Sequence, residues 1–107
     1  MKNGIELIAE ERAAQVAREG WTQEHDDEHE DSELARAAIV YAKEAVAETQ
    51  GRTFAPVLGS DGAPAEWPWD AEWYKPRDPI RNLVRAGALI AAEIDRLQRE
   101  HSSKRTP

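Results

Sequence analysis

The chain has 107 residues, enough for one small domain with a core of modest size. Its formal net charge of −7 at pH 7 argues against binding to a nucleic-acid polymer, whose phosphates require a basic surface. The sequence contains no cysteine, no apolar run as long as a membrane span and no apolar segment of a signal peptide. We therefore expect a cytoplasmic protein without disulfides, thiolate zinc sites or membrane partners.

The first predicted helix covers residues 5–19 and ends at Gly20. Its apolar face is formed by Ile5, Ile8, Ala9 and Val16. Arg12, Gln15 and Glu19 fall within this face, and Glu11 lies at its edge. Because a buried charge requires a partner, these residues are candidates for a functional site. The structural alternative is an ion pair between Arg12 and Glu19.

An acidic stretch joins the first and second predicted helices. Residues 24–31 contain six carboxylates and two histidines but no lysine or arginine. Such self-repulsion is relieved by a cation or a basic partner. Oxygen ligands favour Mg²⁺ or Mn²⁺, and the imidazoles leave room for Zn²⁺ or Fe²⁺. The alternative is a solvated run of charges.

A second helix is predicted after Asp31 or Ser32, either of which can cap it, and it runs to about Thr49 before Gly51. One apolar face consists of Leu34, Ala38, Tyr41 and Ala45, and another of Ile39 and Val46. We therefore expect a central helix that is buried on two sides. Glu33 in its first turn either complements the helix dipole or adds a carboxylate to the acidic stretch.

An irregular segment separates this helix from the last one. Residues 51–66 are rich in glycine and proline, with a short hairpin expected around Asp61 and Gly62. Residues 67–76 then hold three of the four tryptophans of the chain. These rings either pack the loop against the bundle or offer stacking faces to a base or another flat ligand.

The third predicted helix begins at Asp78 and Pro79 and extends to about Glu100, with residues 101–107 as a disordered tail. The residues expected to face inward are Ile80, Leu83, Val84, Gly87, Ile90, Ala91, Ile94 and Leu97. Gly87 in the middle of that face indicates the close approach of another backbone.

Two further stripes follow the same helix. Asn82, Ala86, Leu89 and Glu93 form a second flank, in which Glu93 is either an additional site carboxylate or an ordinary flank residue. Arg81, Arg85, Arg96 and Arg99 form an outer basic stripe that either meets phosphates or is simply solvated. The whole pattern predicts an all-α fold, in which residues 1–100 make a small bundle of three main helices with an irregular Trp- and Pro-rich loop before the last one.

Several segments, in the same order, resemble a family that is common in phages and prophages. They are residues 9–12 with Gln15, residues 19–22 with 25–27, residues 33–35 with 37–38 and 41–42, and residues 67–69, 73–76 and 81–97. The family is the dATP/dGTP diphosphohydrolase group, which is related to the MazG-like all-α nucleotide pyrophosphohydrolases. The resemblance spans about residues 8–97 and skips the excursion at 50–66.

The resemblance implies metal-dependent hydrolysis of dGTP or dATP to the monophosphate and pyrophosphate. It also implies Mg²⁺ or Mn²⁺ as the cofactor, self-association into a homo-oligomer, and the bacterial host cytoplasm as the location. The MazG-like proteins hold their metal with an E-x-x-E and a later E-x-x-D on two helices. This chain departs from that pattern: Glu30-x-x-Glu33 and Glu10 to Glu11 are only partial matches, and Arg36 stands where an aspartate would follow Glu33.

On this basis we expect the metal ligands to come from Glu11, Glu19, Asp26, Asp27, Glu33 and Glu93. Asp27, Glu33 and His25 are the candidate catalytic residues, although His25 is equally consistent with a surface histidine. For the substrate, we expect Arg12 and Lys75 to neutralise the triphosphate and Trp69 or Trp73 to stack on the purine.

A hypothesis from another class competes with the enzyme. The chain would then be a non-enzymatic phage or prophage module for protein binding or assembly. Its acidic loop would engage a basic partner, and its tryptophans would only fill the core. Dependence on a divalent ion separates the two hypotheses, because the enzyme requires the ion and the module does not.

Overall fold

The computed structural model is all-α and describes residues 1–20, 26–27, 32–51 and 64–105. The elements are α1 (Gly4–Glu19), α3 (Glu33–Thr49), the short 3₁₀ helix η1 (Ala71–Trp73) and α4 (Pro79–Arg105). The predicted all-α fold with three main helices is therefore confirmed. None of the described helices combines the length and the apolarity that crossing a membrane requires. The hairpin predicted around Asp61 and Gly62 lies outside the described residues.

Both ends of α1 are set by local hydrogen bonds. The side chain of Asn3 accepts a hydrogen bond from the backbone N–H of Glu6 at 2.9 Å, and the Glu6 carboxylate accepts one from the N–H of Asn3 at 3.2 Å. This reciprocal pair is a capping box. At the other end Gly20 adopts a left-handed conformation with φ of 72° and donates its N–H to the carbonyl of Gln15. The predicted end at Gly20 is confirmed.

The start of α4 is also as predicted, but its end is not. The Asp78 carboxylate accepts a hydrogen bond from the backbone N–H of Arg81 at 2.9 Å and so caps the helix. The helix then continues to Arg105, five residues beyond the expected end at Glu100. Residues 101–105 are therefore helical rather than part of a disordered tail. The reason is that no glycine or proline occurs between residues 88 and 106 to stop the helix.

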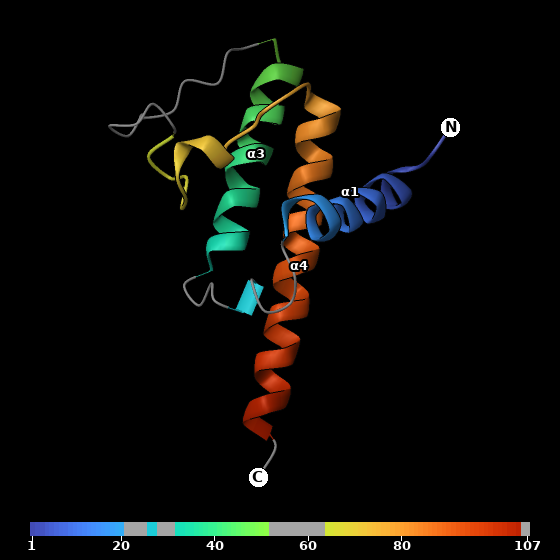
Figure 1. Ribbon diagram of the computed structural model, residues 1–107. Coiled ribbons are helices and arrows are strands. Elements are labelled where there is room, and N and C mark those ends of the chain that lie inside the picture. The colour runs from blue at the N-terminus through green and yellow to red at the C-terminus, as the bar shows by residue number, and fades with distance from the viewer. Residues whose placement is uncertain (21–25, 28–31, 52–63, 106–107) are drawn as a thin grey trace.

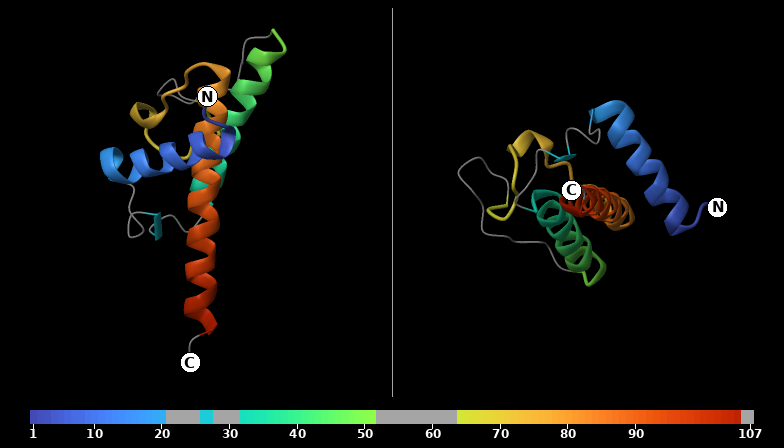
Figure 2. Two further views of the ribbon diagram at one scale, coloured as in Figure 1. Left: turned by 90° about the vertical axis from the view of Figure 1, so that its right-hand side faces the viewer. Right: turned by 90° about the horizontal axis from the view of Figure 1, so that it is seen from below.

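The core lies between α3 and α4, which run antiparallel, while α1 crosses the N-terminal half of α4 (Figures 1 and 2). The buried residues of this core are Leu34, Ala37, Ala38, Val40, Tyr41, Trp67, Ala86, Leu89 and Ala92. Alanines contributed by both helices leave room for their backbones to approach closely. The aromatic loop that contains η1 covers the far side of α3 (Figure 1).

The inward face predicted for α4 is largely wrong. Ile80, Leu83, Ile90, Ile94 and Leu97 are exposed, and of the residues expected to face inward only Val84 and, in part, Gly87 and Ala91 are covered. The predicted second flank, with Asn82, Ala86, Leu89 and Glu93, is buried instead. The sequence carries two stripes at helical spacing, and the smaller side chains of the second allow closer packing against α3.

The other helices also expose aliphatic side chains that the sequence places inside. Ile39 and Val46 of α3 are half exposed, so α3 is not buried on its second face. On α1, Ile5 and Val16 are exposed, whereas the polar residues Glu11 and Gln15 are buried. The described part of the chain therefore leaves much of its aliphatic surface open.

Gly87 is the point at which α1 touches α4. A Cβ atom added there would lie 2.5 Å from Cδ1 and 2.9 Å from Cγ1 of Ile8. The close neighbour is therefore a side chain of α1, and not a backbone as the sequence indicates. The absence of a side chain at Gly87 allows Ile8 to reach the surface of α4.

Replacing Gly87 by alanine should therefore destabilise the protein despite the better helix propensity of alanine. Displacing Ile8 is expected to cost about 2 kcal/mol, against a gain of about 1 kcal/mol in helix propensity. The free energy of unfolding, measured by urea denaturation, should fall by about 1 kcal/mol. In the double variant with Ile8→Ala the clash disappears, so the two effects should not add. Ile5→Ala, at an exposed position of α1, is the matched control and should combine additively; additivity at Ile8 would contradict the contact.

Candidate functional site

Glu11 lies where α1 crosses α4, and its side chain is only 3% exposed. Its carboxylate forms an ion pair with Arg81, and Oε2 lies 3.8 Å from Nε of Arg85. Gln15, one turn further along α1 and also buried, donates its Nε2 to the same Oε2 at 3.5 Å. The guanidinium of Arg85 lies in turn 5.9 Å from the centre of the Tyr41 ring. One buried carboxylate thus binds two arginines of α4.

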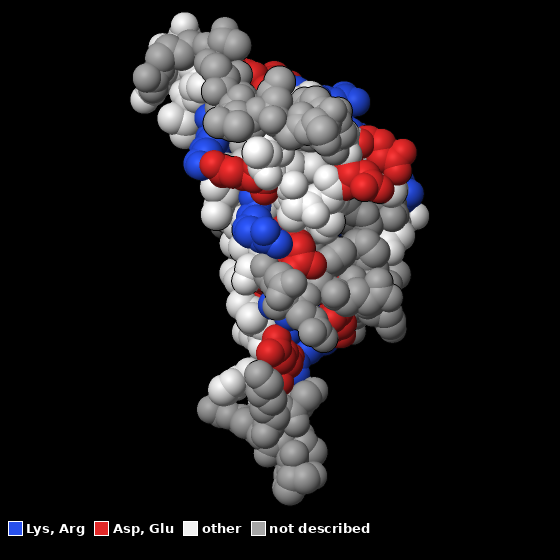
Figure 3. Space-filling view, turned by 90° about the vertical axis from the view of Figure 1, so that its left-hand side faces the viewer, with Lys and Arg blue, Asp and Glu red and all other residues white. Residues whose placement is uncertain are grey.

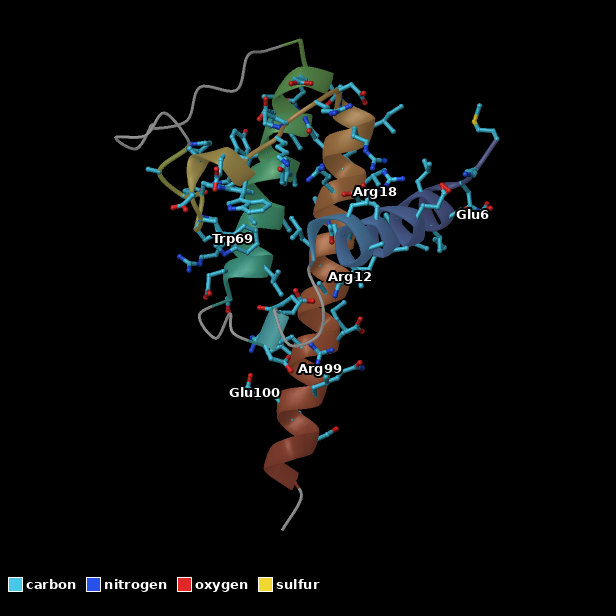
Figure 4. The ribbon with its side chains drawn as sticks, viewed as in Figure 1. Glu6, Arg12, Arg18, Trp69, Arg99 and Glu100 are labelled. Carbon is cyan, nitrogen blue, oxygen red and sulfur yellow. The ribbon has the colours of Figure 1, made fainter. Side chains whose placement is uncertain are left out.

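Asp26 and Asp27 are the described residues of the acidic stretch, and each binds an arginine from a different helix. Asp26 is fully buried and pairs with Arg12 of α1. Asp27 is 48% exposed, and Nη2 of Arg99 donates to its Oδ1 at 2.8 Å. Figure 4 shows Arg12 and Arg99 on opposite sides of this short segment. The segment is therefore held between α1 and α4.

Neighbouring carboxylates raise the pKa of Arg99. The hydrogen bond to Asp27 raises the pKa of the Arg99 guanidinium above its ordinary value, and the negative charges of Asp27, Asp26 and Asp95 add to this effect. Burial opposes it, because desolvation disfavours the charged form. Arg99 is therefore a permanent cation beside the acidic segment.

Glu93 and Glu33 also have arginine neighbours, on their own helices. Nε of Arg96 donates to Oε1 of Glu93 at 2.6 Å, and both side chains are buried. Arg96 also donates to Glu100 at 3.0 Å. The hydrogen bond to Glu93 is the main cause that raises the pKa of Arg96 above its ordinary value, against the effect of burial. Glu33 lies 3.8 Å from Arg36, the residue that departs from the E-x-x-D pattern.

The predicted outer basic stripe is therefore wrong as a description of α4. Arg85 and Arg96 are largely or fully covered, and all four arginines of the stripe bind carboxylates. These arginines are the site residues whose role sequence reasoning missed. The sequence does contain an indication of this role. Acids predicted on a core-facing surface require counter-charges, and α4 has arginines at helical spacing that can supply them.

The described residues do not by themselves form a metal site. Within residues 1–20, 26–27, 32–51 and 64–105, no three side chains of His, Asp or Glu come together to hold an ion. Every predicted ligand that is described has an arginine within 4 Å, namely Glu11, Asp26, Asp27, Glu33 and Glu93. His25 and the side chain of Glu19 lie outside the described part of the chain.

Gln15 adds an oxygen donor that the predicted ligand set does not contain. Its Oε1 is buried beside Glu11 and has no hydrogen-bond partner among the described residues. A buried amide oxygen without a partner is costly, and such oxygens are ligands that Mg²⁺ and Mn²⁺ accept. The oxygens of Glu11 and Gln15 are therefore of the ligand type that a hard divalent cation prefers. The helical projection of α1 already indicates that Gln15 faces the core.

The tryptophan-rich loop packs into the protein through an aromatic cluster. Trp67 makes edge-on contacts with Tyr41 and Trp69, at ring-centre distances of 5.5 and 5.4 Å. Tyr74 lies 5.0 Å from Trp67, and burial followed by its hydrogen bond to Glu44 raises the pKa of Tyr74 well above its ordinary range. The packing interpretation is confirmed for Trp67 and Trp69, and Figure 4 shows Trp69 directed toward α3.

Trp73 differs from the other two rings of this loop. It is 37% exposed, and Nζ of Lys75 lies 5.5 Å from the centre of its ring. The backbone N–H of Lys75 donates to the hydroxyl of Tyr41 at 3.0 Å, which ties this pair to the aromatic cluster. Of the two predicted stacking residues, Trp73 is therefore the one with more of its ring at the surface.

Acidic and basic side chains adjoin one another on the face that carries this loop, rather than forming separate patches (Figure 3). Lys43 and Glu66 are one such pair, at 2.9 Å. Comparison of the chain with protein-family models, with curated proteins and with solved structures finds no match. The roles expected for the site residues therefore stay predictions from the sequence.

Proposed function

We propose that the protein is a metal-dependent nucleoside triphosphate pyrophosphohydrolase that cleaves dGTP or dATP to the monophosphate and pyrophosphate. The observation that carries the proposal is that carboxylates of α1 and of the acidic stretch are paired with arginines of α1 and α4, in two groups. Glu11 and Arg12 come from α1, Asp26 and Asp27 from the acidic stretch, and Arg81, Arg85 and Arg99 from α4. The motifs shared with the diphosphohydrolase family add the substrate class.

This arrangement suits a ligand that carries both signs of charge. In the free protein the carboxylates and the guanidinium groups compensate each other, which keeps the cost of burying them low. A complex of a divalent cation with a triphosphate offers each group a new partner. Carboxylates can then turn to the cation and arginines to the phosphate oxygens, so that no buried charge is left alone.

The residues proposed to hold Mg²⁺ or Mn²⁺ are the acids of the predicted set, joined by Gln15. Such an ion supplies neutralisation of phosphate charge and a more acidic bound water. In the reaction, the oxygen of water bonds to the α-phosphorus, and the bond from that phosphorus to the oxygen bridging to the β-phosphate breaks. Asp27, Glu33 and His25 are the candidate acceptors of the proton from water, and the Asp27 carboxylate is half exposed.

Trp73 and Lys75 are the proposed contacts for the rest of the substrate. The exposed ring of Trp73 offers a stacking face for a purine, and the ammonium group of Lys75 beside it can meet a phosphate. Trp69 contributes less in this proposal, because its ring packs in the aromatic cluster. Self-association, the other property that the family resemblance implies, is part of the proposal.

The test is pyrophosphate release from a panel of deoxyribo- and ribonucleoside triphosphates with Mn²⁺, Mg²⁺ or a chelator. We expect release from dGTP or dATP that the chelator abolishes. Trp73→Ala should raise KM for the purine substrate by about tenfold, since base stacking contributes roughly 1–3 kcal/mol. Trp73→Phe, which keeps an aromatic face, is the control. If protein with an intact helical spectrum released no pyrophosphate from any nucleotide of the panel, the proposal would be contradicted and the binding or assembly module would be favoured.

The arginine pairs also bear on that alternative module, which would use the acidic loop to engage a basic partner. Asp26 and Asp27, the described residues of the loop, already bind Arg12 and Arg99 of the chain itself. A basic partner would first have to displace these arginines. For these two acids the pairing favours the enzyme over the module, because a complex of cation and triphosphate offers the displaced arginines new partners and a basic partner does not.

A further inference from the structure

Tyr41 of α3 brings a polar group into the core. Its side chain is buried, and its ring packs against Trp67 and Tyr74 of the aromatic loop, with ring centres 5.5 and 5.6 Å away. Its hydroxyl accepts a hydrogen bond from the backbone N–H of Lys75 at 3.0 Å. A phenylalanine would fill the same space without burying a polar group, so packing alone does not account for the hydroxyl.

The bond to Tyr41 continues the backbone pairing of the loop beyond η1. The N–H groups of Trp73 and Tyr74 donate to the carbonyls three residues earlier, at 3.1 and 3.0 Å. Lys75 comes next, and Pro76 after it has no N–H to donate. At Lys75 the backbone therefore pairs with α3 instead of with the loop itself, which fixes the loop on the helix at this residue.

Asn82 of α4 holds the adjoining part of the same segment. Its side chain is fully buried, and its Oδ1 accepts a hydrogen bond from the N–H of Arg77 at 2.7 Å. Its Nδ2 donates to the carbonyl of Arg77 at 2.8 Å. Tyr41 and Asn82 thus hold residues 75–77 between α3 and α4. Because both bind the backbone, they fix the path of the chain immediately after the exposed ring of Trp73.

We propose that Tyr41 is a positioning residue for nucleotide binding, an inference that rests on the function proposed above. Its hydroxyl fixes the backbone of Lys75, and this backbone places the ammonium group of Lys75 5.5 Å from the centre of the Trp73 ring. A purine on Trp73 and a phosphate on Lys75 then meet groups that are already in place, so binding does not have to order them. With 1% of its surface exposed, Tyr41 acts through Lys75 and not by touching the nucleotide.

The same ring also lies beside the arginines of the candidate site. The guanidinium of Arg85 is 5.9 Å from the centre of the Tyr41 ring, and Nε of Arg85 is 3.8 Å from Oε2 of Glu11. One side chain of α3 therefore contacts both the loop with the proposed base contact and an arginine of the carboxylate group on α1. This position suits a residue that sets the distance between two parts of one binding site.

Tyr41→Phe tests the role of the hydroxyl, because it keeps the ring and its packing. The probes are the α,β-methylene analogues of dGTP and dATP, which are not cleaved at the replaced bond, in the presence of Mn²⁺. Their dissociation constants, measured by isothermal titration calorimetry, should rise by roughly three- to tenfold, as expected for one lost hydrogen bond. KM for the substrate should rise by the same factor, whereas kcat should stay within about twofold. Amide hydrogen exchange at Lys75 should become faster.

Tyr74→Phe is the matched control, since it removes another hydroxyl of the aromatic cluster, which donates to Glu44 of α3. A hydrogen bond to a carboxylate is stronger than one between neutral groups, so the urea midpoint should fall at least as far in Tyr74→Phe as in Tyr41→Phe. Its affinity for the analogues should nevertheless stay within about twofold, because the bond to Lys75 is intact. A merely structural role would make affinity follow stability. An equal loss of affinity in both variants, or none in Tyr41→Phe, would overturn the proposal.

The inference and the proposed function fail in different ways. Pyrophosphate release by the wild-type chain, together with unchanged affinity in Tyr41→Phe, would contradict the inference alone. Binding of the analogues without any pyrophosphate release would contradict the hydrolysis alone, and the comparison of the two variants would still decide the role of Tyr41. A folded wild-type chain that binds neither analogue would overturn both.

Discussion

Replacing Glu11 by glutamine is expected to lower the free energy of unfolding by about 3 kcal/mol, which makes it one of the most destabilising conservative changes in this chain. The Glu11 carboxylate is buried between Arg81 and Arg85. Glutamine keeps the volume but removes the charge, so the largely buried guanidinium of Arg85 loses the negative charge 3.8 Å away. Arg81 retains contact with solvent and contributes less to the loss.

Glu10 provides the matched control, since it is the adjacent residue of the same type. Its carboxylate is exposed and pairs with Lys2 at the surface, where an ion pair contributes about 0–1 kcal/mol. Glu10→Gln should therefore change the free energy of unfolding by less than about 1 kcal/mol. Both variants are compared by equilibrium urea denaturation at one protomer concentration, because self-association would otherwise shift the apparent stability. Equal effects of the two substitutions would show that water screens the Glu11 site.

Replacing Asp27 by asparagine is expected to reduce pyrophosphate release from the preferred nucleotide by roughly 100- to 10,000-fold. In the proposed function this carboxylate contributes to metal binding and is a candidate acceptor of the proton from water. Its pairing with Arg99 is half exposed, so the free energy of unfolding should change by less than about 1 kcal/mol. The measurement is kcat/KM for the wild-type chain and the variant, with the helical signal as a test of folding.

Asp95→Asn is the control for general electrostatic effects. Asp95 is an exposed acid on α4, and its charge also acts on Arg99. The control should leave turnover within about twofold, because a solvent-screened charge away from the reacting atoms contributes little. If Asp27→Asn retained full turnover, Asp27 would be removed from the set of catalytic candidates, although the proposed reaction class would stand. Loss of helical signal together with turnover would assign Asp27 a structural role instead.

Local chemistry explains why much of the fold is predictable from the sequence. Gly20 ends α1 because it adopts a positive φ without strain, and Asp78 begins α4 because its carboxylate reaches a free backbone N–H. Each of these signals acts over five residues or fewer, so it operates in the same way in an isolated segment. The position of Gln15 on the inner face of α1 also follows from helical periodicity alone.

The candidate site is predictable only in part, because the partners of its acids lie far away in the sequence. The sequence identifies Glu11, Asp26, Asp27 and Glu93 as acids in need of compensation, and the structure provides that compensation through arginines. The partners of Glu11 are 70 and 74 positions away in the chain, so no local rule connects them. The positions of His25 and of the Glu19 side chain lie outside the described residues.

By itself, the sequence determined the helices, most of their ends and which residues share each helical face. The tertiary structure decided which of those faces meet. Two stripes of α4 have the same periodicity, and periodicity contains no information about which stripe has a partner. That choice depends on how closely α3 approaches, where the alanine-rich stripe packs more tightly than the stripe of leucine and isoleucine. The same choice brings the arginines of α4 to the carboxylates of α1 and of the acidic stretch, and it leaves the larger aliphatic side chains of α4 exposed.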